Sequence, residues 1–136
     1  MRKLNQPLLT VDAVVLLNKH SIVLVKRRKP PFEGFWALPG GFVEYGETVE
    51  AAVEREVFEE TGLKVRILKL IGVFSKPDRD PRGHVVSIAF LAEAVEGKLR
   101  ESDESFEVKA FKIEELPEKL AFDHREIIGE ALRKLR

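Results

Sequence analysis

The stretch Gly40–Leu63, GGFVEYGETVEAAVEREVFEETGL, decides the fold because it joins glycine-rich turns to a helix-forming segment and holds seven glutamates. Pro39 and the glycines break regular structure and permit backbone conformations that are closed to other residues. Thr48 suits the N-cap of a helix, and Gly62 suits its C-terminal end. The sequence therefore predicts a shaped loop followed by a helix from about Thr48 to Thr61.

One face of this helix combines apolar and acidic side chains. At about 100° per residue, the apolar stripe comprises Val49, Ala52, Val53 and Val57. Glu56 and Glu60 project from the same side, and Glu59 lies at its margin. Carboxylates in a buried stripe repel one another and lose hydration, which costs several kcal/mol unless a proton or a cation compensates. Mg²⁺ takes oxygen ligands and bridges carboxylates to phosphates, so a metal site would relieve this repulsion. A solvated acidic helix is the alternative for EREVFEE alone, and the flanking glycines with the full spacing favour the metal site.

Two further residues of the helix lead to expectations about its surroundings. Arg55 and Glu59 are four apart, so they can pair and partly offset the negative charge. We expect Arg55 to orient the acidic cluster without reacting itself. Phe58 falls opposite the apolar stripe, so we expect the helix to pack on more than one side.

Composition limits the class of protein. The chain has 136 residues, which is enough for one domain with a core, and 44% of them are hydrophobic. Lysine plus arginine equals aspartate plus glutamate at 23 each, so no global field draws it to nucleic acid or to a membrane. It has no cysteine, no apolar run of membrane-spanning length and no secretory signal in MRKLNQPLLTVD, so we expect a cytoplasmic protein. The high charge content, with few asparagine, glutamine and methionine residues, is typical of thermophile proteins.

The rest of the chain alternates apolar segments with polar turns. Period and β-branched content predict strands at residues 8–17, 22–27, 63–73, 84–95 and 108–113. Residues 122–135 predict a C-terminal helix with Ile127, Ile128, Ala131, Leu132 and Leu135 on its apolar face.

The loop after the second predicted strand supplies candidate substrate contacts. Arg27 or Arg28 could reach a phosphate, although a run of cations is also typical of a solvated strand end. Phe32 or Phe35 could stack on a nucleobase, because loops carry binding groups. We assign Trp36 to the core.

Two later loops hold other candidates. The loop 74–83 carries Arg79 and Arg82, whose planar donors suit a pyrophosphate. The alternative is a rigid hairpin tip whose charges pair among themselves. In the acidic loop 98–107, Asp103 or Glu104 could act as a base, although surface acids commonly only solvate a loop. We interpret His124, in the last helix, as structural.

The spacing of Gly41, Glu47, Arg55-Glu56, Val57, Glu59-Glu60, Gly62 and Leu63 fills every fixed position of the Nudix hydrolase signature, and residues 41–63 resemble the Nudix box. The surrounding order of strands and helices is similar to the whole Nudix domain. The resemblance implies one domain over residues 1–136, an α/β/α sandwich around a mixed sheet, with a loop-helix-loop that binds Mg²⁺ or Mn²⁺. It also implies that Glu56, Glu59 and Glu60 are metal ligands or base, that the Gly40 carbonyl completes the shell, and that Arg55 orients the cluster.

The resemblance also implies an activity. Members of the family hydrolyse the pyrophosphate of nucleoside diphosphate derivatives. The stretches SKPDRDPRGHVVS and LAFDHREII look like those of the ADP-ribose pyrophosphatase subfamily, so we expect ADP-ribose to be cleaved to AMP and ribose 5-phosphate. The proline that this subfamily often carries about sixteen residues beyond the box is absent from that position. Related ADP-ribose enzymes are often dimers, so a homodimer is a further expectation.

Two alternatives share most of these features. A diadenosine polyphosphate or oxidised-nucleotide hydrolase would use the same metal chemistry. A Nudix-like transcription regulator would keep the domain to sense ADP-ribose without catalysis. The intact box glutamates and the lack of a basic surplus or winged helix favour turnover.

Overall fold

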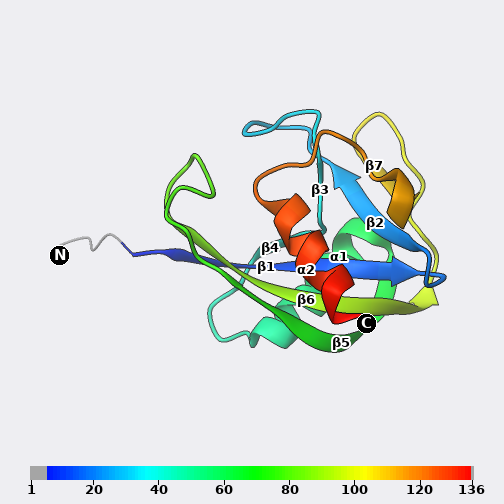
Figure 1. Ribbon diagram of the computed structural model, residues 1–136, viewed down its shortest axis with the longest axis horizontal. Helices are drawn as coiled ribbons and strands as arrows, with labels where there is room; N and C mark the ends of the chain where they lie inside the picture. The colour runs from blue at the N-terminus through cyan, green and yellow to red at the C-terminus, as the bar shows by residue number, and fades with distance from the viewer. Residues whose placement is uncertain (1–5, 136) are drawn as a thin grey trace.

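A seven-stranded mixed sheet forms the centre of the molecule (Figure 1). The computed structural model describes residues 6–135. The strands are β1 (Leu8–Leu17), β2 (Ser21–Lys26), β3 (Trp36–Ala37), β4 (Gly40–Phe42), β5 (Leu63–Phe74), β6 (Val85–Gly97) and β7 (Glu107–Lys112). The strand order is β3-β2-β1-β6-β5, with β4 also paired to β1 and β7 to β2. Among the paired strands of residues 6–135, β1 and β6 run parallel and the other pairings are antiparallel.

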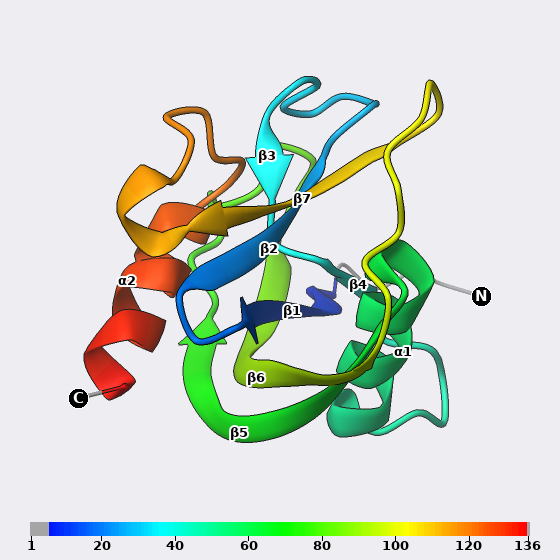
Figure 2. The same cartoon turned by 90° about the vertical axis from the view of Figure 1, so that its right-hand side faces the viewer.

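Two helices cover opposite faces of this sheet, α1 (Val49–Thr61) and α2 (His124–Lys134), and a 3-10 turn η1 (Ile113–Glu115) follows β7 (Figure 2). Strand β1 serves both faces because its side chains alternate. Val11, Ala13 and Val15 pack in the core under α1, whereas Val14 and Leu16 pack in the core under α2. The predicted strand at residues 8–17 and the predicted α/β/α sandwich are therefore confirmed.

The limits of α1 follow from local signals, as predicted. The Thr48 hydroxyl accepts a hydrogen bond from the Ala51 N–H at 3.1 Å, which caps the helix. Gly62 ends it in the left-handed conformation at φ 79°. A Cβ at Gly62 would lie 2.6 Å from the Lys98 carbonyl oxygen, so only glycine fits there.

Three expectations need correction. Phe58 is 50% exposed, so α1 packs on the sheet side only and the expected second packing face is wrong. Leu135 is 45% exposed, because α2 ends at Lys134 and carries it away from the core. The segment Gly40–Phe42, expected as an irregular loop, forms β4, because it pairs with β1 over three residues.

The other predicted elements lie within two residues of their observed ends. Residues 1–5, which hold part of the stretch judged for a secretory signal, and residue 136 lie outside the described residues, as do the two ends of the expected 1–136 domain. Within residues 6–135, no helix is long and apolar enough to cross a bilayer.

The packing of α2 leads to a test of stability. Ile127 is fully buried between α2 and the sheet, so Ile127→Ala should lower the free energy of unfolding by about 2–5 kcal/mol. The exposed Phe58→Ala should change it by less than about 0.5 kcal/mol. Urea denaturation followed by circular dichroism measures both. Equal losses in the two variants would contradict the assigned packing.

Candidate active site

Arg55, in the middle of α1, is the centre of an ion-pair network. Its Nε and one terminal nitrogen donate to the two oxygens of Glu47 at 2.6 and 2.9 Å. Its other terminal nitrogen donates to Glu56 at 2.8 Å and to Glu59 at 3.1 Å. The predicted Arg55–Glu59 pair is confirmed. Sequence reasoning missed Glu47 as a partner, because it lies before the helix and meets Arg55 only when the loop folds back.

This network holds charged groups in fixed positions. The hydrogen bonds from Arg55 lower the pKa of Glu47 to about 2, helped by a hydrogen bond from the Glu44 N–H. The pKa of Arg55 is raised by its bonds to Glu47 and Glu56. One guanidinium therefore orients two glutamates of the helix from a carboxylate anchor in the preceding loop.

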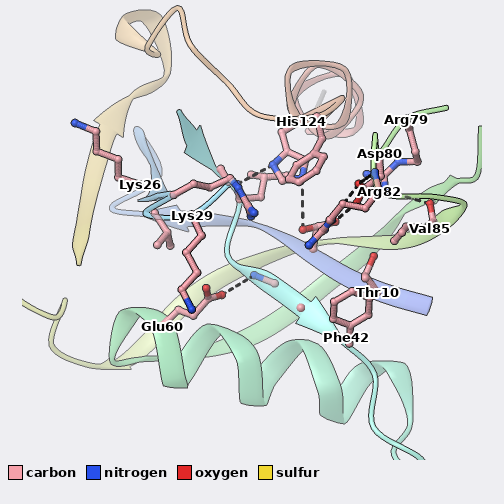
Figure 3. A pocket seen from close by; sticks show the side chains of 18 of the residues that line it. Thr10, Lys26, Lys29, Phe42, Glu60, Arg79, Asp80, Arg82, Val85 and His124 are labelled. Carbon is pink, nitrogen blue, oxygen red and sulfur yellow. Dashed lines mark hydrogen bonds and ion pairs between the residues drawn. The ribbon is translucent and has the colours of Figure 1, made fainter. Parts of the chain in front are cut away.

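Glu60 lies on the sheet side of the same helix. Its Oε1 accepts a hydrogen bond from the Gly40 N–H at 2.8 Å (Figure 3). Burial raises the pKa of Glu60 to about 8, and the negative charges of Glu56 and Asp12 add to the effect. Burial also raises the pKa of Glu56. The predicted repulsion between half-buried carboxylates is therefore present. Arg55 compensates the charge of Glu56 through a hydrogen bond, but it makes no hydrogen bond to Glu60.

The glycines of β4 bring these acids together. A Cβ at Gly41 would lie 2.6 Å from the carboxylate of Glu56, and one at Gly40 would lie 2.6 Å from Asp12 Oδ1. The carboxylates thus pack directly against the β4 backbone. Within residues 6–135, no three acidic or histidine side chains already point at one metal position. The donor set nevertheless fits a hard divalent cation, because it consists of carboxylate oxygens whose burial disfavours the uncompensated charge.

A cavity of about 400 Å³ opens beside Glu60 (Figure 3). Its walls come from β2 and the loop after it, from β4, from the loop before β6 and from the start of α2. Of the residues predicted to act in the site, Gly40, Glu60, Arg27, Arg79 and Arg82 line this cavity. Those that do not line it are Phe35, Arg55, Glu56, Glu59 and Glu104.

The three arginines of the cavity differ in how far their donors are already used. Arg79 donates to both oxygens of Asp123 and to the Val85 carbonyl, and its side chain is 4% exposed. Arg82 is paired with Asp80, its neighbour in the same loop. Arg82 therefore fits the alternative in which the charges of the loop pair with one another. Arg79 instead links the loop to Asp123, the residue before α2. Its donors are engaged in this way, and its role in binding substrate stays a prediction.

Arg27 has the most available donors of the three. Its Nε donates to the Pro31 carbonyl at 2.6 Å, and among the described residues it has no carboxylate within 4.0 Å. Burial and the charge of Arg82 lower the pKa of Arg27. An anion in the cavity would therefore find at Arg27 a guanidinium without a competing carboxylate.

Phe122 forms the aromatic wall of the cavity, a role that the sequence analysis did not assign. The guanidinium carbon of Arg27 lies 5.0 Å from its ring centroid and that of Arg82 lies 5.7 Å away. Phe32 packs edge-on against Phe122 at 4.9 Å, and Phe35 packs on Phe32 at 5.4 Å, behind the wall. The stretch LAFDHREII, which contains Phe122, was the signal that could have found it.

A buried polar group lies at the back of the cavity, also unpredicted as a unit. His124 and Asp12 are 3% and 8% exposed. Burial lowers the pKa of His124 to about 3 and raises that of Asp12 to about 7. Ser87 donates a hydrogen bond of 2.5 Å to Asp12, and Leu38 donates one of 3.0 Å to His124. His124 is thus buried and neutral, as its structural interpretation requires.

Other predicted residues lie away from this centre. Trp36 packs against Phe111 at 4.9 Å and joins the core under α2, as expected. Glu104 is exposed in the loop between β6 and β7, where Asp103 accepts hydrogen bonds from Ser105 and Phe106. The role of Glu104 as a base stays a prediction.

The fold and the site together define a class: an α/β domain in which a loop-helix-loop presents glutamates to a cationic cavity. The chain belongs to the NUDIX domain family, which matches residues 7–131, and it is a Nudix hydrolase. The resemblance seen in the sequence is confirmed. Nudix hydrolases generally use divalent metal ions.

Three known proteins are informative. The chain is 50% identical over 127 residues to an ADP-ribose pyrophosphatase of Methanocaldococcus jannaschii, covering 93% of this chain and 74% of that protein. It is similar to the NUDIX domain of Shewanella oneidensis NrtR complexed with ADP ribose, with a TM-score of 0.82 and 29% identity, covering 98% of this chain and 91% of the other. It is also similar to a bifunctional NMN adenylyltransferase/ADP ribose pyrophosphatase of Francisella tularensis complexed with AMP and a manganese ion. There the TM-score is 0.81 and the identity 29%, covering 99% of this chain but 44% of the other.

The raised pKa of Glu60 predicts a pH-dependent stability. Glu60 titrates near pH 8 when folded and near 4.5 when unfolded, so the folded state holds the extra proton and stability falls as pH rises between these values. In EDTA at pH 9, Glu60→Gln should therefore melt several degrees above the wild type, and the difference should shrink toward pH 5. Thermal denaturation measures it, with the exposed Glu54→Gln of the same helix as control. A pH-independent difference would show that Glu60 is not the group responsible.

Proposed function

We propose that the chain is an ADP-ribose pyrophosphatase that uses Mg²⁺ or Mn²⁺ to hydrolyse ADP-ribose to AMP and ribose 5-phosphate. The observation that carries this proposal is that one cavity has Glu60, β4, Arg27 and Phe122 together in its walls. A substrate with a pyrophosphate between a base and a sugar needs acidic, cationic and aromatic side chains close enough for one bound molecule to contact all of them. The identity with the Methanocaldococcus jannaschii enzyme supports the same substrate.

Phe122 is the residue on which we propose that the adenine stacks. Its ring lines the cavity, and Arg27 holds one side of it in a cation–π contact at 5.0 Å. Arg82 lies further away at 5.7 Å and its side chain is 47% exposed, so a base stacked on this face would displace the guanidinium from the ring. Base–aromatic stacking contributes about 1–3 kcal/mol. This moves the predicted stacking role from Phe32 or Phe35 to the ring that they support.

Cationic side chains provide for the pyrophosphate. Arg27 offers terminal donors that no carboxylate occupies among the described residues. Lys29 extends from the loop after β2 toward Glu60 (Figure 3). Guanidinium and ammonium groups placed this way neutralise the phosphate oxygens and hold the scissile bond beside the glutamates. Arg79 and Arg82 then act mainly by shaping the wall of the cavity.

The box glutamates are the proposed ligands of the metal. Glu56, Glu59 and Glu60 would hold it, with the carbonyl of Gly40 as a further donor. When bound, a divalent ion supplies an activated water and polarises the phosphoryl oxygens. Arg55 keeps Glu56 and Glu59 in place through the contacts described above. The proton from the attacking water passes to a carboxylate, for which Glu59 and Glu104 are the two candidates.

The wider properties are also proposals. A cytoplasmic location and a thermophilic origin are supported by the absence of cysteine and by the charge-rich composition. The balanced charge supports a small nucleotide, not a nucleic acid, as the partner. A homodimer is supported by the exposed apolar residues Leu68, Leu70 and Val73 on the edge strand β5. Light scattering at several concentrations would test the dimer.

A panel of substrates tests the activity. With Mg²⁺ or Mn²⁺, ADP-ribose should be hydrolysed with a kcat/KM at least about tenfold above those of 8-oxo-dGTP and diadenosine polyphosphates. Glu56→Gln should reduce kcat by about a hundredfold or more, because it removes a carboxylate from the metal cluster. Chromatography of the products measures both. Preference for another nucleotide would refute the ADP-ribose assignment, and tight binding of ADP-ribose without release of AMP would refute turnover.

The aromatic wall leads to a second prediction. Phe122→Ala should raise KM for ADP-ribose about tenfold or more while leaving kcat within about threefold, because stacking binds ground and transition states alike. Phe122→Tyr should keep the wild-type KM, and Phe35→Ala should change it much less. Initial-rate kinetics over a range of ADP-ribose concentrations decide the matter. A larger rise in KM for Phe35→Ala than for Phe122→Ala would show that Phe35, and not Phe122, stacks on the base.

A further inference from the structure

The turn Leu38–Gly40, which leads into β4, is held at three consecutive backbone groups by three different elements. Its first N–H donates to His124 Nδ1 of α2 at 3.0 Å, and its proline carbonyl accepts from the Ala13 N–H of β1 at 3.0 Å. Its last N–H donates to Glu60 Oε1 of α1 at 2.8 Å. The position of the Glu60 carboxylate therefore depends on a turn whose other end is held by α2.

His124 holds this turn in place of a backbone acceptor. Trp36 pairs with the segment before α2 as in a parallel ladder: its N–H donates to Lys119 at 2.9 Å, and its carbonyl accepts from Ala121 at 2.8 Å. In such a ladder the Leu38 N–H would donate next to the Ala121 carbonyl. That carbonyl instead accepts from the His124 N–H at 3.1 Å, because the chain turns there into α2. The imidazole occupies the acceptor position that the ladder has lost.

The surroundings of the imidazole select one form of the ring. Nδ1 must be unprotonated to accept from Leu38, and burial lowers the pKa of His124, so the ring is neutral with its hydrogen on Nε2. Nε2 faces Asp12 Oδ1 at 3.6 Å, and the other oxygen of Asp12 accepts from Ser87. Leu38 is itself 4% exposed, so solvent is a poor substitute partner for its N–H. The ring is thus the acceptor on which this turn relies.

We propose that His124 is a positioning residue for hydrolysis, which sets the Leu38–Gly40 turn and through the Gly40 N–H fixes the carboxylate of Glu60. The inference rests on the proposed role of Glu60 in the reaction. It assigns to α2 a part in the metal-binding face, although α2 packs on the opposite side of the sheet from α1 (Figure 2). Within residues 6–135, the polar partners of the His124 ring are the Leu38 N–H and Asp12, neither of which belongs to α1 or to the expected metal ligands. His124 therefore acts on Glu60 through the backbone.

The same residue also connects this turn to the wall of the cavity. The ring of Phe122 lies 5.3 Å from that of His124, and the two residues are separated by one position in the chain. A ligand stacked on Phe122 would therefore lie next to the contact between Phe122 and His124. From Phe122, a short path of contacts leads through His124 and the Leu38–Gly40 turn to the Glu60 carboxylate.

Two variants separate the acceptor from the bulk of the ring. Asparagine at position 124 places its amide oxygen where Nδ1 lies, so His124→Asn should retain the bond to Leu38. His124→Leu fills similar space without an acceptor, and His124→Met serves the same purpose if the leucine variant does not fold. Ile127→Ala, one turn along α2, is the control for lost stability alone.

Hydrogen exchange of the Leu38 and Gly40 amides in metal-free protein, followed by NMR, gives a direct readout. His124→Leu should speed their exchange by about tenfold or more beyond the change in Ile127→Ala, because a buried N–H loses its acceptor. His124→Asn should stay near the wild type. In kinetics with ADP-ribose, His124→Leu should lower kcat by about tenfold or more with little change in KM, because misplacing a reacting group impairs the chemical step. Mn²⁺ affinity, measured by electron paramagnetic resonance, should fall in the leucine variant and not in the asparagine variant.

Several results would overturn the inference. Unchanged exchange in His124→Leu would show that the turn does not need the imidazole. Equal loss in His124→Asn and His124→Leu would show that the acceptor is not what matters. Faster exchange with normal kcat and normal Mn²⁺ affinity would reduce His124 to a structural residue. If the wild type hydrolyses no substrate, the proposed function fails by itself, and exchange with Mn²⁺ affinity still decides the role of His124.

Discussion

The hydrogen bond between the Gly40 N–H and the Glu60 carboxylate is the contact on which the site depends. It can form only because β4 lies so close to β1 that a Cβ at Gly40 would be 2.1 Å from the Val11 carbonyl oxygen. The absent side chain lets β4 pair with β1, and that pairing carries the Gly40 N–H to α1. Backbone geometry in the centre of the sheet thus sets the place of a carboxylate on the helix.

The glutamates of α1 carry more negative charge than the neighbouring cations compensate. Arg55 compensates Glu47, Glu56 and Glu59. Within residues 6–135, Glu60 has a hydrogen bond from a backbone N–H and no ion pair, while it lies near Glu56 and Asp12. Such a group is destabilising when charged, and a protein retains it where a ligand supplies the missing positive charge. Lysine and arginine side chains line the same cavity, where they can face an anionic substrate. The two halves of the site therefore have opposite charge needs that one metal-bound pyrophosphate can meet.

Interactions within the box were predictable because they are local. The capping of α1 by Thr48, its end at Gly62 and the Arg55–Glu59 pair all follow from positions a few residues apart. Packing was less predictable: the sequence suggested a second packing face at Phe58, and in the described residues this side chain is 50% exposed. Arg79 shows the same limit, since its partner Asp123 lies 44 residues away.

The sequence by itself determined the family, the acidic face of α1 and the strands that bury it, because period, capping and glycine placement act over short range. Only the tertiary structure decided which residues line the cavity. The segment that leads into α2 returns across the sheet to the carboxyl end of β2 and to β4. This return brings together in one cavity residues that are far apart in the chain: Asp12, Arg27, Leu38, Glu60, Phe122 and His124. Such contacts join residues up to 86 positions apart, as between Leu38 and His124, and no local pattern encodes them. Their geometry arises from how two helices and seven strands pack together.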